Sequence, residues 1–218
     1  MPPSYFSPLR TAWHRHGFRR ESLATLAVAV PVIFGLTRFL ESVERRSGAV
    51  LTDPVLALFR PVDLTWLTFL IIYAGLISAI ALLLRHPRNL MLALQTYCLT
   101  AAARMIAMWL LPLDPPEGMI ALKDPVVELF GGGNTLTRDL FFSGHTSTLL
   151  IVALATPGRA ARAAYFVCTA AVGLSVILQH VHYTIDVVAA LFFAYGCYRM
   201  IVLFHGKITL GSDPAEVP

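Results

Sequence analysis

The sequence predicts an all-α, polytopic membrane protein whose fold is a bundle of six transmembrane helices. The 218-residue chain is 56% hydrophobic and only 14% charged, and its mean hydropathy of +0.67 is too high for an ordinary soluble domain. Long apolar runs also recur, and each approaches the ~20 residues that a helix needs to cross the hydrocarbon of a bilayer. The runs cover residues 22–40, 62–84, 90–111, 140–156, 160–179 and 183–204.

The first apolar run follows Arg19 and Arg20, as in a signal peptide, but it is long and no small-residue cleavage site follows it cleanly. We therefore expect a retained helix. The later connections contain no Ser/Gly-rich linker, so residues 22–205 are predicted to form one six-helix catalytic domain. Residues 1–21 are predicted to be a cytoplasmic segment, either basic and amphipathic or disordered, and residues 206–218 a cytoplasmic tail.

The basic residues predict how the bundle is oriented. The formal net charge is +4, but Lys and Arg are scattered between apolar runs and form no stripe of the kind that binds nucleic acid. If the runs alternate across the membrane, one side carries ten basic residues: Arg10, Arg15, Arg19, Arg20, Arg85, Arg88, Arg159, Arg162, Arg199 and Lys207. The other side carries five: Arg45, Arg46, Arg60, Lys123 and Arg138. Since cytoplasmic loops carry the excess of Lys and Arg, both termini are expected in the cytoplasm and loops 41–61, 112–139 and 180–182 outside.

A first polar motif, residues 142–146 (FSGHT), lies at the outer end of the fourth predicted helix. Ser143 can cap this helix, whose unpaired N–H groups and dipole then form an anion site suited to phosphate. Gly144 has no side chain and lets a phosphate approach the backbone. His145, beside this anion site, is a candidate acid or base.

A second motif, residues 180–186 (HVHYTID), lies at the outer start of the sixth helix. His182 and Asp186 are four residues apart and therefore share one helical face. A carboxylate that accepts the proton of one imidazole nitrogen leaves the other nitrogen free as a nucleophile. A single interfacial histidine is often only a hydrogen-bonded anchor, but ionisable groups within membrane helices are costly and usually functional. Six helices place both motifs at the same membrane face.

Arg104 and Asp139 are further candidates for this site. Arg104 lies seven residues before the outer end of the third predicted helix, so we expect it about 10 Å inside that end. There it can clamp phosphate oxygens, whereas snorkelling to the interface is the alternative. Asp139 is expected to orient His145, with a surface-loop position as the alternative.

The remaining polar residues near the outer face are weaker candidates. They are Glu117, Glu128 and His180, whose spacing from His182 turns it to a different side. Residues 125–130 are predicted to form a short outer helix, and residues 131–133 (GGG) a flexible connection or a phosphate cradle. No cofactor or metal is expected, because the histidines lack carboxylates or thiolates at ligand spacing; a zinc hydrolase is the less favoured alternative.

Both motifs resemble the third and fourth motifs of sphingomyelin synthases and related ceramide phosphotransferases. The upstream order is similar too: residues 97–109 around Arg104, the Pro-rich turn to Gly118, the glycine triplet and Asp139. The resemblance covers residues 62–205. It implies six transmembrane helices, a bundle like that of the type 2 phosphatidic acid phosphatases, and metal-independent transfer of a phospho-head group between lipids at the non-cytosolic face.

The resemblance also implies a mechanism. His182 attacks the phosphate of a glycerophospholipid, Asp186 orients His182, and His145 protonates the departing diacylglycerol oxygen. A phosphohistidine diester results, and His145 then deprotonates the hydroxyl of an incoming ceramide-like lipid. The substrate-binding residues implied are Arg104, Asp139, Ser143, Gly144, His180 and Tyr183.

The sequence also departs from the patterns of related enzymes. The lipid phosphatases place a Ser-Arg pair shortly before the nucleophilic histidine, where this chain has Ser175 and Val176. The missing arginine argues against a standard phosphatase and favours the synthase branch, although Arg104 and Arg138 could supply the charge in its place. Thr137-Arg138 stands where animal synthases tend to have Cys-Gly, so the head group, of the phosphocholine or phosphoethanolamine class, stays open.

We therefore expect a lipid phosphotransferase that uses a phospholipid donor and a ceramide-like or diacylglycerol lipid. A homo-oligomer is compatible with this expectation. The main alternative is a lipid phosphatase or phospholipase C-like hydrolase that uses the same residues with water as the acceptor. A catalytically inactive transporter or scaffold that only binds lipid is the third hypothesis.

Overall fold

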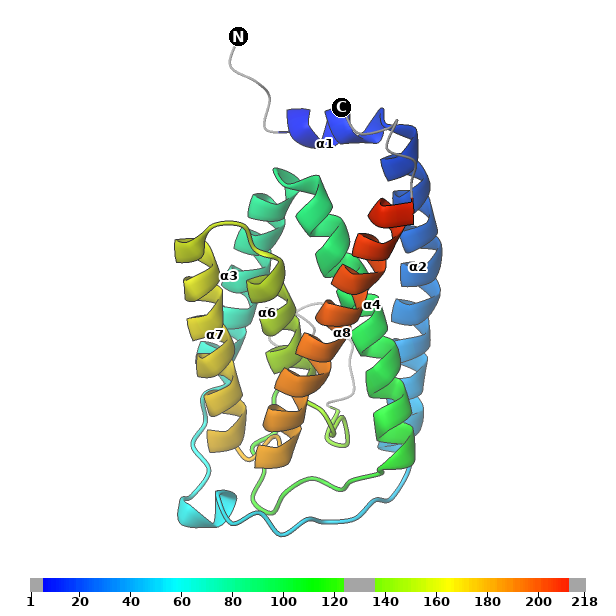
Figure 1. The fold of residues 1–218 in the computed structure, drawn as a ribbon. Helices are drawn as coiled ribbons and strands as arrows, with labels where there is room; N and C mark the ends of the chain where they lie inside the picture. The colour runs from blue at the N-terminus through cyan, green and yellow to red at the C-terminus, as the bar shows by residue number, and fades with distance from the viewer. Residues whose placement is uncertain (1–5, 124–135, 212–218) are drawn as a thin grey trace.

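The computed structural model describes residues 6–123 and 136–211, with side chains up to residue 205, and in these ranges the chain forms only helices and connecting loops. Figure 1 shows the long helices packed alongside one another as a bundle. The elements are α1 Ser7–Trp13, α2 His16–Glu44, the 3₁₀ turn η1 Leu56–Leu58, α3 Thr65–Leu84, α4 Pro87–Leu110, α6 Gly144–Ala155, α7 Arg159–Leu178 and α8 Thr184–Gly211. The predicted all-α class is confirmed for the described residues.

Five of these helices are long and apolar enough to cross a membrane: α2, α3, α4, α7 and residues Thr184–His205 of α8. They indicate an integral membrane protein, as predicted. The predicted count of six spans is not confirmed, because the run 140–156 corresponds to α6, an apolar helix of only 12 residues. At 1.5 Å per residue α6 is about 18 Å long, which is shorter than the roughly 30 Å of hydrocarbon.

α6 is short because a serine cap starts it late. Ser143 Oγ accepts a hydrogen bond from the N–H of Thr146, which fixes the first turn at Gly144. The preceding residues are apolar, so hydropathy assigned them to the span, but they form a non-helical entry loop (residues 136–143). Leu140 and Phe142 in this loop are buried. In Figure 1 α6 accordingly begins inside the bundle.

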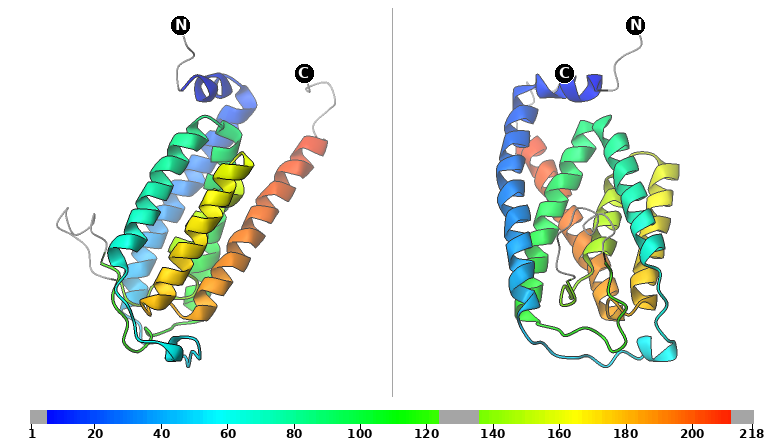
Figure 2. Two further views of the ribbon diagram at one scale, coloured as in Figure 1. Left: turned by 90° about the vertical axis from the view of Figure 1, so that its left-hand side faces the viewer. Right: turned by 180° about the vertical axis from the view of Figure 1, so that it is seen from behind.

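The core of the bundle is built around α6. Leu149 of α6 is fully buried and packs with Phe69 of α3, Val172 and Val176 of α7, and Val187 of α8. Figure 2 shows from two further sides that α6 lies inside the bundle, whereas α2 lies at its periphery. The site at the start of α6 is therefore enclosed by other helices.

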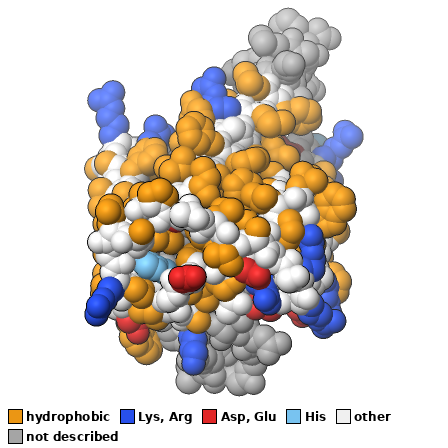
Figure 3. Space-filling model, turned by 90° about the horizontal axis from the view of Figure 1, so that it is seen from below, with side chains coloured by type: hydrophobic (Ala, Val, Ile, Leu, Met, Phe, Trp, Pro, Cys, Tyr) orange, Lys and Arg blue, Asp and Glu red, His pale blue; other side chains and the backbone are white. Residues whose placement is uncertain are grey.

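The connections divide between the two ends of the bundle. α1, the α3–α4 turn, the α6–α7 turn and the last turn of α8 lie at one end (Figures 1 and 2). The loops that precede α3, α6 and α8 lie at the other, which Figure 3 shows as apolar side chains with dispersed acidic and basic ones. We call this second end the loop face. Neighbouring loops are tied together there: Ala49 pairs with Leu113, and the N–H of Val62 bonds the carbonyl of Leu178.

Two helices extend beyond the apolar runs that predicted them. α2 begins at His16, six residues before the run 22–40, and α8 continues to Gly211, beyond the run 183–204. Polar residues extend both helices beyond the apolar stretch that hydropathy detects. The predicted short helix 125–130, Glu128 and the glycine triplet 131–133 lie outside the described residues.

Candidate active site

The two polar motifs meet where α6 and α8 begin. The backbone N–H of Ser143 donates to the carbonyl of Asp186 at 3.2 Å, which ties the first motif directly to the second. Neither residue is exposed to solvent. Ser143 and Asp186, which are 43 positions apart in the sequence, thus lie at the same depth of the bundle.

His182 and Asp186 form a buried pair. His182 Nδ1 lies 3.2 Å from Asp186 Oδ2, and the side chains are 3% and 0% exposed. The same carboxylate oxygen accepts the backbone N–H of Tyr183 at 3.2 Å. An imidazole that donates from Nδ1 to a carboxylate presents Nε2 as its free lone pair. In that tautomer the lone pair of His182 Nε2 is not used by Asp186.

Arg104 turns inward rather than snorkelling to the membrane surface. The residue is 6% exposed, and its Nε donates to the carbonyl of Phe142 at 2.6 Å. A terminal guanidinium nitrogen donates to Asp139 Oδ1, also at 2.6 Å. α4 thus places one fixed positive charge against the entry loop that leads into α6.

Asp139 binds this arginine, and the expectation that it orients His145 stays a prediction. Burial alone would raise the pKa of the Asp139 carboxyl, but the charge and hydrogen bond of Arg104 hold that pKa below its usual range. Positive charge on His182 or His145 acts in the same direction, because both imidazoles lie near the carboxylate. The charges of Arg104 and of both histidines therefore favour the ionised form of Asp139.

Gly144 allows Arg104 to lie directly against the start of α6. A Cβ atom at this position would lie 3.0 Å from the guanidinium carbon and 3.1 Å from one terminal nitrogen. These separations are tighter than those of most real side chains, so any larger residue here would push the guanidinium away by a few tenths of an ångström. The guanidinium and the N–H groups of the first helical turn consequently face the same space.

A cavity of about 450 Å³ opens at this point and is polar at one part of its wall and apolar at another. We call it the Arg104 cavity. Arg104, Asp139 and His145 line it together with Tyr97, and its apolar wall comes from α2, α3 and α6: Leu36, Ile72, Leu76 and Leu149. The His145 ring also meets Phe69 edge-on, at 6.2 Å between ring centres. The cavity thus has the Arg104–Asp139 ion pair on one part of its wall and apolar side chains on another.

Two predicted substrate-binding residues serve the loop face instead. His180 Nδ1 lies 3.1 Å from the backbone carbonyl of Glu117, and its ring packs edge-on against Phe59. The hydroxyl of Tyr183 donates to the carbonyl of Asp114 at 2.9 Å and accepts the N–H of Leu51 at 3.1 Å. These contacts anchor the loops, and neither side chain lines the Arg104 cavity, as is also true of His182 and Asp186.

The sequence analysis missed the residue that holds the entry loop. Glu44, the last residue of α2, accepts three hydrogen bonds: from Thr137 Oγ1 at 2.5 Å and from the N–H groups of Thr137 and Arg138, both at 2.9 Å. The guanidinium of Arg138 donates to Asp114 at 2.6 Å, so this arginine binds the loop face rather than the Arg104 cavity. No local spacing indicates a contact between residues 93 positions apart.

Two further residues were missed. Asp53 caps α8 from a distant loop: its carboxylate accepts from Thr184 N–H at 2.6 Å and from Thr184 Oγ1 at 3.1 Å. Tyr97 lines the Arg104 cavity, and here a signal existed, since it lies seven residues before Arg104 and thus on the same face of α4. Among the residues that the structure describes, no three His, Cys, Asp or Glu side chains gather as a potential metal site.

The comparisons with known proteins bear on the stretch that carries both motifs. Residues 138–203 match the family model described as PAP2 superfamily C-terminal. The match supports a place in the lipid phosphatase and phosphotransferase superfamily, and with it an enzymatic function, but it does not single out the sphingomyelin synthase branch. No curated protein and no solved structure matches the chain. The PAP2-like stretch contains His145, His182 and Asp186, whereas Arg104 and Glu44 lie outside it.

Proposed function

We propose that this protein is an integral-membrane phosphotransferase that moves a phospho-head group from a glycerophospholipid to a ceramide-like lipid alcohol and releases diacylglycerol. The head group is of the phosphocholine or phosphoethanolamine class. The observation that carries the proposal is the buried His182–Asp186 pair, which is tied to the start of α6 by the hydrogen bond from Ser143 to Asp186. Its histidine acts electrostatically on Asp139, which lines the Arg104 cavity together with Arg104 and His145. The PAP2-like match over the same residues supports it.

In the first half of the reaction, His182 is the nucleophile and His145 the acid. Asp186 holds Nδ1 of His182, so the lone pair on Nε2 attacks the phosphorus atom of the donor lipid. The bond between phosphorus and the diacylglycerol oxygen breaks, and that oxygen takes a proton from His145. Diacylglycerol leaves, and the head group remains on His182 as a phosphohistidine diester.

In the second half, His145 is the base. It removes the proton from the hydroxyl of the lipid alcohol, whose oxygen forms a new bond to phosphorus as the bond to His182 breaks. His182 is regenerated and His145 is again protonated. With water in place of the lipid alcohol, the same steps release the free phospho-head group, which is the hydrolase alternative.

Arg104 and the start of α6 stabilise the phosphoryl oxygens. The guanidinium lies directly over Gly144, so it and the first helical turn can bind the same negative charge. Asp139 holds the guanidinium in this orientation and offsets its charge when the cavity holds no phosphate. The apolar wall of the Arg104 cavity then accommodates the hydrocarbon beside the head group.

The proposed membrane arrangement has six passages, with residues 140–155 as the short one. α6 does not need to match the bilayer thickness, because neighbouring helices and the buried residues of the entry loop enclose it. The end that carries α1 is rich in Lys and Arg and is assigned to the cytoplasm. The catalytic site therefore faces the non-cytoplasmic side.

The experiment is a lipid-product assay on purified protein in nanodiscs. Labelled phosphatidylcholine or phosphatidylethanolamine is supplied with and without ceramide, and products are identified by mass spectrometry. We expect a new phosphosphingolipid and diacylglycerol in equal amounts. If the products are free phospho-head group and no phosphosphingolipid, the protein is a hydrolase and the transferase proposal is wrong.

Two substitutions test the roles of the residues. His182→Ala is expected to abolish diacylglycerol release, and Asp186→Asn to reduce it less, because the nucleophile remains but its orientation is lost. His14→Ala, in the turn that follows α1 at the opposite end, is the matched control and should leave turnover unchanged. Undiminished diacylglycerol release in His182→Ala would refute the mechanism.

A further inference from the structure

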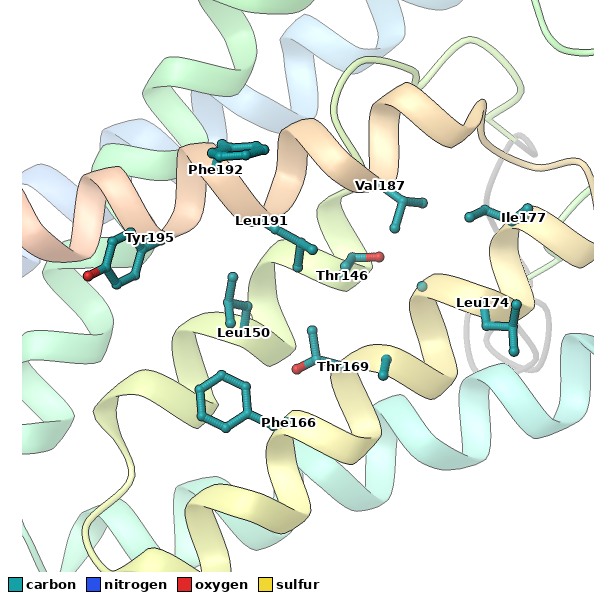
Figure 4. A pocket seen from close by; sticks show the side chains of 12 residues that line it. Thr146, Leu150, Phe166, Thr169, Leu174, Ile177, Val187, Leu191, Phe192 and Tyr195 are labelled. Carbon is teal, nitrogen blue, oxygen red and sulfur yellow. The ribbon is translucent and has the colours of Figure 1, made fainter. Parts of the chain in front are cut away.

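A second hollow lies on the other side of α6. It has a volume of about 640 Å³ and is formed by residues of α6, α7 and α8 (Figure 4). We call it the α7–α8 groove. Thr146 and Leu150 of α6 belong to its lining, whereas Gly144, His145 and Leu149 line the Arg104 cavity. α6 therefore separates two spaces that both begin at its first turn.

The α7–α8 groove differs from the Arg104 cavity in charge. Every side chain that lines it is uncharged, and the polar ones are only Thr146, Thr169 and Tyr195. Thr146 Oγ1 already donates to Ser143 and Thr169 Oγ1 to the carbonyl of Tyr165, so neither hydroxyl needs a ligand. The groove lies on helices that are apolar enough to span a membrane, and it suits a hydrocarbon chain without charge.

One end of the groove is lined by residues that directly follow two of the proposed catalytic residues in the sequence. At its outer end lie Thr146 and Val187, the immediate neighbours of His145 and Asp186. Gly173 lies against both, since a Cβ there would be 3.1 Å from Val187 Cγ1 and 3.6 Å from Thr146 Cγ2. From Val187 to Tyr195 the groove follows eight residues of α8, a length of about 12 Å.

We propose that the α7–α8 groove binds a hydrocarbon chain of the acceptor lipid alcohol. This inference rests on the proposed transferase function, which requires two lipids at one site. The donor carries a phosphate, and the fixed positive charge that matches a phosphate lies in the Arg104 cavity. The hydrocarbon of the acceptor is uncharged and matches the uncharged groove, and the proposal requires its hydroxyl to pass the first turn of α6, at Thr146, to meet His145. The two lipids approach from opposite sides of α6 and do not compete for one space.

The test combines labelling with turnover. A lipid alcohol with a diazirine in its chain is photolysed with the protein in phosphatidylcholine nanodiscs, and the labelled peptides are mapped. Leu174→Trp fills the rim of the groove with a side chain that is already 58% exposed. Leu70→Trp on α3 is the matched control: its position is 66% exposed, lies a similar number of residues from its helix end and does not line the groove.

We expect label on α7 and α8 that excess unlabelled lipid alcohol displaces and excess phosphatidylcholine analogue does not. Leu174→Trp should reduce this label and the transfer to long-chain acceptors about tenfold. Diacylglycerol release without acceptor and transfer to short-chain acceptors should stay within twofold. Leu191→Trp, on the opposite rim, gives a second variant should Leu174→Trp not purify as a monodisperse protein.

Equal labelling of Leu174→Trp and Leu70→Trp, or displacement of the label by the phospholipid, would overturn the groove assignment. If the proposed function itself is wrong, the result differs: the wild-type protein releases no diacylglycerol. The photolabelling is still informative in that case, because it shows independently whether the groove binds the lipid alcohol.

Discussion

Gly144 shows how much of the candidate site depends on an absent side chain. We predict that Gly144→Ala lowers the rate of diacylglycerol release by about tenfold or more, since displacements well below 1 Å of a clamping group are costly in catalysis. The cause is that the new Cβ would lie 3.0 Å from the guanidinium carbon of Arg104, which must move. Initial rates of the two purified proteins measure the effect.

Gly196→Ala is the matched control for this prediction. Gly196 also lies in a helix, but a Cβ there meets nothing within 4 Å. Turnover of Gly196→Ala should equal that of the wild-type protein. If Gly144→Ala retains the wild-type rate, a shift of Arg104 does not affect catalysis. Arg104 would then not belong to the proposed phosphate site.

The pairings of individual residues could be predicted only where they are local. The four-residue spacing of His182 and Asp186 predicts their contact, and the structure forms it. Arg104 and Asp139 are 35 residues apart, and the sequence contains nothing that fixes the approach of α4 to the entry loop. The sequence suggested a role for Asp139 beside His145 from nearness alone, and it did not indicate that Arg104 binds the same carboxylate.

At the scale of single elements, the start of α8 is held by a residue from a distant loop. We predict that Asp53→Ala destabilises the protein by about 1 kcal/mol, the usual effect of losing a helix cap. It should also lower turnover, because His182 and Asp186 flank the capped Thr184. Thermal unfolding in detergent and the lipid assay measure the two effects.

The effect of Asp53 also depends on pH. Burial tends to raise the pKa of its carboxyl, but hydrogen bonds from Thr184, Val55 and Leu56 outweigh burial and hold the pKa below its ordinary value. A carboxyl whose pKa is lower in the folded than in the unfolded protein stabilises the fold at pH values above its unfolded pKa. This stabilisation is lost as the pH falls through the folded pKa. The difference in stability between the wild-type protein and Asp53→Ala should therefore shrink below about pH 4.

Asp63 provides the control for Asp53. It caps the local start of α3 by accepting the N–H of Thr65 at 3.0 Å, and its pKa is also lowered by this hydrogen bond. Asp63→Ala should leave turnover unchanged, because α3 carries no proposed catalytic residue. Equal losses of activity in both variants would show that capping at the loop face acts on overall stability alone.

The apolar runs predicted which helices exist but not where each ends. Hydropathy detects the apolar centre of a helix, so it missed the polar turns by which α2 extends to His16 and Glu44. It also included Leu140 and Phe142 in a helix, because a buried loop and a buried helix are both rich in apolar residues. Ser143 marks the boundary between this loop and α6, and the sequence does predict its hydroxyl as a helix cap.

At the scale of the whole molecule, the charge distribution predicts orientation. We expect a cysteine at Leu58, an 81% exposed position on the loop face, to react with a membrane-impermeant maleimide added to intact cells. A cysteine at Arg159, at the opposite end, should react only after the membrane is permeabilised. The reverse pattern would place the catalytic site in the cytoplasm.

The wild-type protein supplies the background for this experiment. Its cysteines at 98 and 197 are buried and the one at 168 is half-buried, so their labelling should be weak. Counting basic residues along the sequence groups the same loops that the bundle gathers at the α1 end. That grouping was predictable because consecutive passages alternate in direction, whereas the contacts within the loop face were not.

Glu44 ends α2, yet it holds the backbone of Thr137, which the ribosome adds 93 residues later. Arg104 likewise precedes its partner Asp139 by 35 residues, and His182 and Asp186 follow after two more helices. Each early member of the site is thus synthesised before its partner. The proposed site can therefore be complete only after α8, which carries Asp186, has been made.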